Sequence, residues 1–287
     1  MKGILFGGCS FTWGQGLYFY SDLPGLVYPP NETTYERHNL TDAHLKFKDT
    51  IRHPRLIANH FNTFEVVKNL NGGCEDETFD FFNIIFNSNK NGEDHLSNEK
   101  YSYEDFDYVI IQLSQISRNK FWFTLDGKEQ YCGAWVGPTE PRDKNIPGDN
   151  EIKFGYNIEN LFIWMEQNNM SVDEWFDLHK DLQVKRLKKE LMFYENKGIK
   201  PIIFAWTDEL LDRIKKDDYL YNKFINLEYN GEIYETIENL QRKNGYLEIK
   251  GDVSNFKETP PMDHHPSKEC HKIFAQNIIK RIEKDLI

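Results

Sequence analysis

Cysteine is scarce in this sequence, and no two cysteines lie close together. Only four occur among 287 residues, without any Cys-x-x-Cys spacing; they are Cys9, Cys74, Cys132 and Cys270. Structural zinc sites need closely spaced pairs of ligands, and disulfide-stabilised domains need many cysteines in a short chain. The sequence therefore predicts reduced thiols and no metal site.

Long hydrophobic runs are missing too. No apolar stretch approaches the ~18–20 residues that a membrane-spanning helix needs. The N-terminus passes from Met1-Lys2 directly into a short apolar strand, without the apolar region of a signal peptide. We therefore expect a soluble, cytoplasmic protein with no membrane partner.

Basic residues are outnumbered, since 35 lysines and arginines stand against 46 acidic residues for a formal net charge of −11. The basic clusters at 185–189 and 213–216 have helical spacing beside acidic residues, which is typical of solvated helix faces. Proteins that bind nucleic acids usually carry a basic face. We therefore expect no nucleic-acid partner.

Common nucleotide and hydrolase motifs are absent. Nothing matches Gly-x4-Gly-Lys-Ser/Thr, and the stretch 14–19 (GQGLYF) breaks the Gly-x-Gly-x-x-Gly fingerprint of dinucleotide-binding proteins. The Gly-x-Ser-x-Gly elbow of α/β-hydrolases does not fit either, because Thr12 occupies the last glycine position. We expect no cofactor.

What the sequence does contain is a repeated rhythm of strands and helices. Short apolar runs predict strands at 2–6, 63–69, 108–113 and 202–206. Helical patterns lie at 52–61, at 78–86, from the capping box at 171–174 to about 198, and from 266 onward. This alternation predicts an α/β fold of three layers, α/β/α, with a central parallel sheet.

We expect one domain over 1–287 with two departures from this rhythm. The first is an inserted aromatic-rich segment at about 118–170, and the second is a helical excursion at about 207–250. The aromatic residues of the insertion, Trp122 among them, either wall the functional site or pack into a small core of their own.

Polar and glycine residues follow the strands where folds of this class bind ligands, at the carboxyl ends. Ser10 follows the first strand in Gly7-Gly8-Cys9-Ser10. The corresponding residues after the second and third strands and before the last helix are Asn69, Asn71, Gly72, Gly73, Gln112, Ser114, Arg118, Asp263, His264 and His265.

These residue types suit a serine nucleophile, which needs a base, a carboxylate that orients the base, and donors for the oxyanion. Ser10 is the candidate nucleophile, His265 the base and Asp263 its partner. The candidate oxyanion donors are Gly72, Gly73, Asn69, Asn71 and Gln112. The candidates for contact with the substrate are Trp13, Ser114, Arg118, Trp122 and His264. In the plainer alternative, Ser10 caps a helix and His265 is a surface group.

Three blocks of this sequence resemble the SGNH/GDSL hydrolases. ILFGGCSFTWGQG resembles the first block of that family, which carries the nucleophilic serine after the first strand. NLNGGCEDETF resembles the block with the oxyanion glycine, and DHHPSKECHKIFAQNI the last block, in which an Asp and a His precede the terminal helix. Cys9 replaces the usual Asp before the serine, and Ile111-Gln112-Leu113-Ser114 replaces the Gly-x-Asn-Asp block.

The resemblance implies a flavodoxin-like SGNH fold and a serine esterase that removes a small acyl group, such as acetyl, from a small-molecule or carbohydrate ester. Two alternatives stay open. The same triad would serve an acetyltransferase, and the missing Gly-x-Asn-Asp block would suit a catalytically silent binding or structural protein.

Overall fold

Four parallel strands form the central sheet in a computed structural model that describes residues 1–14, 16–21, 23, 41–67, 74–87, 101–132, 158–249 and 263–287. The strands are β1 (Gly3–Gly7), β2 (Glu65–Val67), β3 (Phe106–Leu113) and β6 (Lys200–Ala205), in the order β2-β1-β3-β6. Each pair of neighbours is parallel. The four strands predicted from apolar runs and the parallel sheet are thus confirmed.

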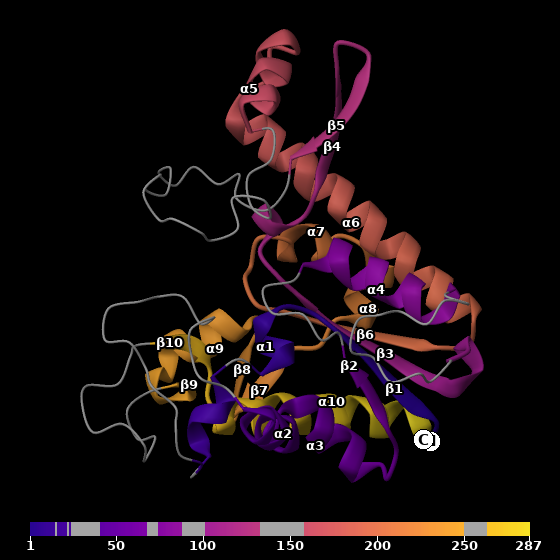
Figure 1. Ribbon diagram of the computed structural model, residues 1–287, viewed down its shortest axis with the longest axis vertical. Coiled ribbons are helices and arrows are strands. Elements are labelled where there is room, and N and C mark those ends of the chain that lie inside the picture. The colour runs from indigo at the N-terminus through magenta and orange to yellow at the C-terminus, as the bar shows by residue number, and fades with distance from the viewer. Residues whose placement is uncertain are drawn as a thin grey trace.

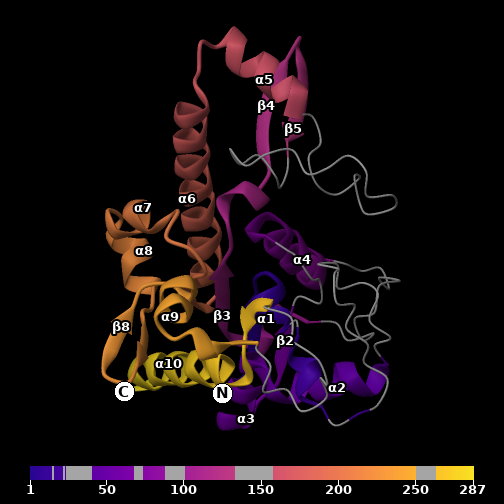
Figure 2. The same ribbon diagram turned by 90° about the vertical axis from the view of Figure 1, so that its left-hand side faces the viewer.

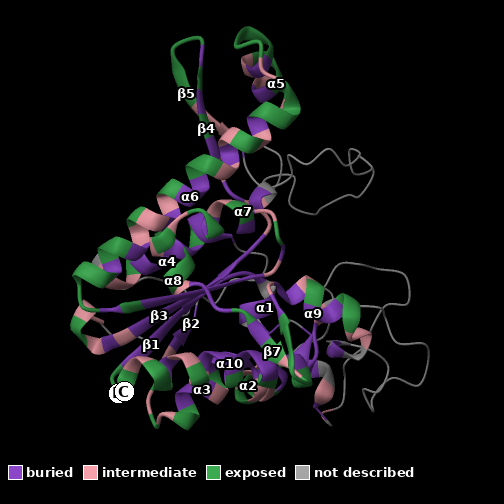
Figure 3. Ribbon diagram, turned by 180° about the vertical axis from the view of Figure 1, so that it is seen from behind, coloured by how far each residue is buried: buried purple, intermediate pink, exposed green. Residues whose placement is uncertain are grey.

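Helices cover both faces of the sheet, which makes three layers (Figure 1). Alternate residues of a strand point to opposite faces, so Ile4 and Phe6 of β1 belong to one core and Leu5 to the other. The first core is closed by α3 (His53–His60) and α10 (Lys268–Leu286), the second by α4 (Glu75–Asn87) and α6 (Val172–Asn196). The sheet strands are buried along almost their whole length (Figure 3).

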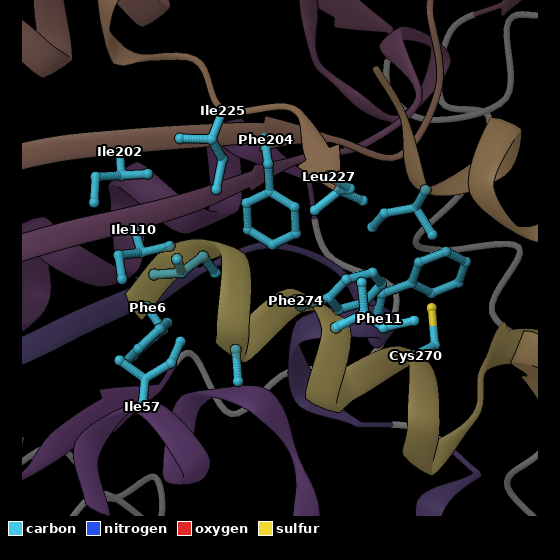
Figure 4. Packing of buried hydrophobic residues seen from close by; sticks show 14 of the residues in the cluster. Phe6, Phe11, Ile57, Ile110, Ile202, Phe204, Ile225, Leu227, Cys270 and Phe274 are labelled. Carbon is cyan, nitrogen blue, oxygen red and sulfur yellow. The ribbon is translucent and has the colours of Figure 1, made fainter. Parts of the chain in front are cut away.

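The first core is aromatic and aliphatic. Phe6, Ile110 and Ile202 extend from three neighbouring strands toward Phe274 of α10 and Ile57 of α3 (Figure 4). The apolar face predicted for the last helix is confirmed, since Ile273, Phe274, Ile278 and Ile282 are all buried.

The predicted capping box of α6 is also confirmed. The Ser171 Oγ accepts a hydrogen bond from the Glu174 backbone N–H at 3.3 Å, and the Glu174 carboxylate accepts one from the Ser171 N–H at 2.8 Å. Gly198, with a φ of 82°, follows the end of the helix in the left-handed region that glycine tolerates. The capping box and the glycine each involve residues that are close together in the sequence, so both ends of the helix can be predicted from it.

The helix α2 (Asp42–Ile51) was not expected from the sequence. Its buried positions carry His44 and Lys48 instead of apolar side chains. A search for apolar residues at helical spacing therefore finds no pattern in this segment.

The described part of the insertion forms an arm that extends away from the sheet (Figures 1 and 2). It contains the hairpin β4 (Phe121–Leu125) and β5 (Lys128–Cys132), with Asp126-Gly127 at the turn, and α5 (Ile158–Gln167). Phe121 and Phe123 pack with Trp175 of α6 in a separate small core. Of the two alternatives for the aromatic residues of the insertion, Phe121 and Phe123 therefore follow the second, since they pack into a small core and do not wall the functional site.

The helical excursion expected at about 207–250 contains helices but also strands. The segment contains α7 (Leu211–Lys215), α8 (Asp218–Lys223), β7 (Leu227–Tyr229), β8 (Glu232–Tyr234), α9 (Ile237–Lys243), η5 (Gly245–Leu247) and β9 (Glu248–Ile249). Asn230 and Gly231 join β7 to β8 with φ values of 52° and 77°. Asn-Gly is the preferred pair for a two-residue hairpin turn with both φ angles positive, so the sequence did contain the signal.

The core predicts a large difference between two substitutions on α10. Ile278 is completely buried against the sheet, whereas the Leu286 side chain near the end of the same helix is 61% exposed. We expect Ile278→Ala to lower the free energy of unfolding by about 2–5 kcal/mol, and Leu286→Ala by less than about 0.5 kcal/mol. Urea unfolding of the two variants measures this, and equal losses would contradict the packing described here.

Candidate active site

The sheet changes its winding direction at β1. The chain goes from β1 to β2 on one side and later to β3 on the other, so the loops after β1 and β3 diverge at their carboxyl ends. In open α/β sheets, ligands bind in the crevice at this point. The helix α1 (Ser10–Trp13) begins here, directly after the end of β1.

Gly8 makes the tight passage from β1 to α1 possible. Its φ of 153° lies in the region that favours glycine, and a Cβ at this position would lie 2.3 Å from the Thr12 Oγ1 and 3.0 Å from the Gln112 Cβ. A larger residue would therefore push the start of α1 away from β3. The glycine lets the backbone that carries Ser10 lie against the neighbouring strand.

Gln112, near the end of β3, holds this loop through buried hydrogen bonds. Its Oε1 accepts from the Cys9 Sγ at 3.3 Å and from the Thr12 Oγ1 at 3.1 Å, while its Nε2 donates to the Leu113 carbonyl at 3.2 Å. The amide is thereby fixed in orientation and supports the residues on both sides of Ser10. The oxyanion role predicted for Gln112 stays a prediction. It requires the second hydrogen of the Gln112 Nε2, which does not take part in the hydrogen bond to Leu113.

The strand β10 (Asp263–Pro266) lies against α1, although the two come from opposite ends of the sequence. The His265 ring meets the Phe11 ring edge to face, with centroids 5.2 Å apart and planes at 70°. β10 is held on its other side by antiparallel pairing with β9. The structure thus brings the predicted nucleophile segment and the predicted base together.

Several predicted site residues lie outside the described part of the structure. For Ser10, Trp13, Asp263 and His264 the structure describes the backbone, and their side chains lie outside it. Asn69, Asn71, Gly72 and Gly73 lie outside it entirely. Their predicted roles remain predictions.

Ser114 has a partner that the sequence did not suggest. Both its N–H and its Oγ donate to the Glu75 carboxylate, the Oγ at 3.0 Å, and the Asn119 Nδ2 donates to the same carboxylate at 2.7 Å. Complete burial raises the pKa of Glu75, and the hydrogen bonds from Asn119 and Ser114 oppose this rise. In this structure Ser114 binds the first turn of α4, so it is a structural residue rather than an open substrate contact.

The neighbouring Asp76 extends this buried network. Its carboxylate pairs with Arg186 of α6 and accepts a hydrogen bond from the Lys120 N–H at 2.5 Å. Burial raises the pKa of Asp76, and the nearby Arg186 opposes the rise. The start of α4 is therefore anchored to both α6 and the loop after β3.

Two fully buried histidines fix the first turns of α10. The His271 Nδ1 accepts from the His53 backbone N–H at 3.2 Å and lies 3.0 Å from the His53 Nδ1. Because the His271 Nδ1 accepts, its proton is on Nε2, and the His53 Nδ1 is the donor. Burial lowers the pKa of His271 to about 3, with Arg52 and His265 adding to the effect, and burial lowers the pKa of His53 as well. The pair is neutral and ties α10 to α3 shortly after His265.

Trp206, which directly follows β6, was not singled out from the sequence. Its ring lies 4.6 Å from the Phe11 ring, centroid to centroid, and 4.9 Å from the Arg118 Cζ, so Arg118 lies at this edge of the sheet. Inspection of the residue after every predicted strand would have found Trp206. By contrast, Trp122 lies on β4 with its half-exposed ring against Tyr131, and no contact in the described part links it to α1 or β10.

No family model matches this chain, and no curated protein or solved structure matches it. Among the residues described here, no three His, Cys, Asp or Glu side chains are grouped so that they would hold a metal ion. Within the same ranges, none of the helices has the length and apolar character needed to span a membrane.

The burial of Glu75 predicts a pH-dependent effect of Glu75→Gln. Because the folded-state pKa of Glu75 is raised, its contribution to stability is full below the unfolded pKa and is lost as the pH rises through the folded pKa. Glutamine does not titrate. We therefore expect the stability of Glu75→Gln relative to the wild type to increase from pH 4.5 toward neutral pH.

Urea unfolding of both proteins at several pH values tests this. Glu166→Gln, at an exposed position of α5, serves as a control. A difference between Glu75→Gln and the wild type that stays constant over the pH range would show that Glu75 does not carry the effect.

Proposed function

We propose that the protein is a serine ester hydrolase of the SGNH type, with Ser10 as nucleophile, His265 as general base and Asp263 as the partner of His265. The observation that carries the proposal is the contact between α1 and β10 at the point where the sheet changes its winding direction. Segments that resemble the first and last blocks of one hydrolase family are neighbours in space, at the edge where such sheets bind ligands. The strand order β2-β1-β3-β6 agrees with the flavodoxin-like order expected for that family.

In this mechanism the Ser10 hydroxyl attacks the ester carbonyl while His265 takes its proton, and the alcohol leaves with that proton. Asp263 orients the imidazole and stabilises its charged form, and water then hydrolyses the acyl-enzyme by the reverse steps. The Ser10 amide and the amides of Gly72 and Gly73 are the proposed oxyanion donors. The substrate is an ester of a small acyl group, such as acetyl, on a small molecule or a carbohydrate.

The surroundings of His265 support this role. The edge-to-face contact with Phe11 restricts rotation of the imidazole, and the neutral pair formed by His53 and His271 anchors the helix that follows it. Such preorganisation is what a general base needs, because proton transfer depends on hydrogen-bond geometry.

One observation favours the alternative of a catalytically silent binding protein. The family's Gly-x-Asn-Asp block is replaced here, and Gln112, at that position, is engaged by Cys9, Thr12 and Leu113. Loss of one oxyanion donor typically costs about 10²–10³-fold in rate. An experiment must therefore distinguish a slow enzyme from a catalytically silent protein.

The other alternative, an acetyltransferase, would use the same residues and transfer the acyl group to an acceptor other than water.

The first test is Ser10→Ala with 4-nitrophenyl acetate as substrate and a fluorophosphonate probe as label. We expect the variant to lose turnover by about 10³-fold or more and to lose labelling, because the nucleophile is gone. Ser102→Ala, at the opposite end of β3, is the matched control and should keep both. A wild type that neither turns over nor labels would favour the silent protein, and labelling without turnover would favour acyl transfer.

The second test distinguishes two adjacent histidines. We expect His265→Ala to lower kcat/KM by about 10²–10⁴-fold, because it removes the general base, and His264→Ala to have a much smaller effect. Both proteins are compared by circular dichroism to confirm that they fold. The reverse order of the two effects would transfer the role of base to His264.

A further inference from the structure

Arg118 ends the short helix η4 (Ile116–Arg118), which begins three residues after β3. It therefore lies at the carboxyl edge of the sheet, on the side where the loops after β1 and β3 diverge. Its side chain is partly exposed. A charged group at this edge is in reach of a ligand in the crevice.

The Arg118 guanidinium lies over the aromatic ring of Trp206. Its Cζ lies 4.9 Å from the centroid of the Trp206 ring. The Trp206 ring contacts Phe11 at 4.6 Å, and Phe11 in turn contacts His265 at 5.2 Å. A short series of ring contacts thus connects the guanidinium with the proposed general base, and the indole ring attracts the cation that lies over it.

Among the arginines that the structure describes, Arg118 differs in having no carboxylate partner within the described residues. Every other arginine in the described ranges lies within ion-pair distance of a carboxylate; these are Arg52, Arg55, Arg186, Arg213, Arg242 and Arg281. Arg118 forms no ion pair within those ranges, and its buried Nη1 has no hydrogen-bond partner there. A charged donor without a partner is costly, and because the rest of the Arg118 side chain is partly exposed, an anionic ligand from solution can supply the missing opposite charge.

A carboxylate fits this position. A guanidinium is permanently charged and presents parallel N–H donors in one plane, which match the two oxygens of a carboxylate. The Arg118 guanidinium lies over the Trp206 ring, and no carboxylate of the described residues takes up its donors. In a chain with a net charge of −11, an arginine at the proposed active site without a carboxylate partner in the described ranges is a local attraction for an anion.

We propose that Arg118 and Trp206 form the anion-binding part of the active site, and that the natural substrates are esters that carry a carboxylate. This rests on the proposed function, because it names the substrate class of that same site. The carboxylate lies in either the acyl part or the alcohol part of the ester.

Matched pairs of esters test the proposal. The pair 4-nitrophenyl hydrogen succinate and 4-nitrophenyl butyrate places a carboxylate or a methyl group at the end of the acyl chain. The pair 4-acetoxybenzoate and its methyl ester places the carboxylate in the alcohol part. We expect the wild type to have a higher kcat/KM for the charged member of at least one pair.

Substitution of Arg118 should remove this preference. We expect Arg118→Gln to lower the ratio of kcat/KM for the charged ester to that for the neutral ester by about 10–100-fold, the value of a charge-assisted contact. Arg118→Lys keeps the charge and loses the planar donors, so an intermediate ratio is expected. Arg242→Gln, on a side chain that is 72% exposed, is the control and should leave the ratio unchanged.

A binding measurement makes the test independent of turnover. We expect succinate to bind the wild type in calorimetric titration and to bind Arg118→Gln at least about 10-fold more weakly. If the wild type hydrolyses none of the esters, the esterase proposal fails and the titration alone decides on the anion site. Unchanged ratios together with unchanged succinate binding would overturn the anion site while the esterase stands. Tighter binding of inorganic phosphate than of succinate would overturn the choice of a carboxylate.

Discussion

The position of β1 in the middle of the sheet is the constraint on which the rest of the site depends. Because β1 pairs with β2 on one side and with β3 on the other, the segments that follow β1 and β3 begin next to each other at the same edge of the sheet. The absence of a side chain at Gly8 lets α1 begin close to β3, and the buried amide of Gln112 binds the residues on both sides of Ser10. The backbone of the proposed nucleophile is therefore set by sheet pairing and a few buried hydrogen bonds.

Buried polar groups connect the elements that lie next to this edge of the sheet. Glu75 joins the start of α4 to the loop after β3, and the pair of His53 and His271 joins α10 to α3. Each of these groups is removed from water and so needs its partner, because an unsatisfied buried donor or acceptor is costly. Such contacts hold their segments in one arrangement more specifically than apolar packing does. These buried contacts thus connect the elements that lie next to the carboxyl edge.

Aromatic contacts connect two parts of the proposed site, the general base and the anion-binding arginine. Phe11 lies against the proposed base, and Trp206 lies between Phe11 and Arg118. An ester carbonyl near Ser10 and an anionic group near Arg118 would then occupy neighbouring positions along one row of rings. Phe11, Arg118 and Trp206 follow three different strands, and their contacts link the proposed general base to the proposed anion-binding residues.

Local patterns in the sequence predict the strands, the capped helices and the order of chemical groups along the sheet edge. Apolar runs, the box at Ser171 and the apolar face of α10 are local patterns, and the rule that ligands bind at carboxyl ends placed Ser10 and His265 in one region. The contacts of Ser114 with Glu75, of Gln112 with Cys9 and of Arg118 with Trp206 arise only in the folded chain. The tertiary structure also showed α2, whose buried face is polar and leaves no apolar period. The reason is physical: local patterns act over a few residues, whereas the partner of a buried polar group lies wherever the folded chain brings it.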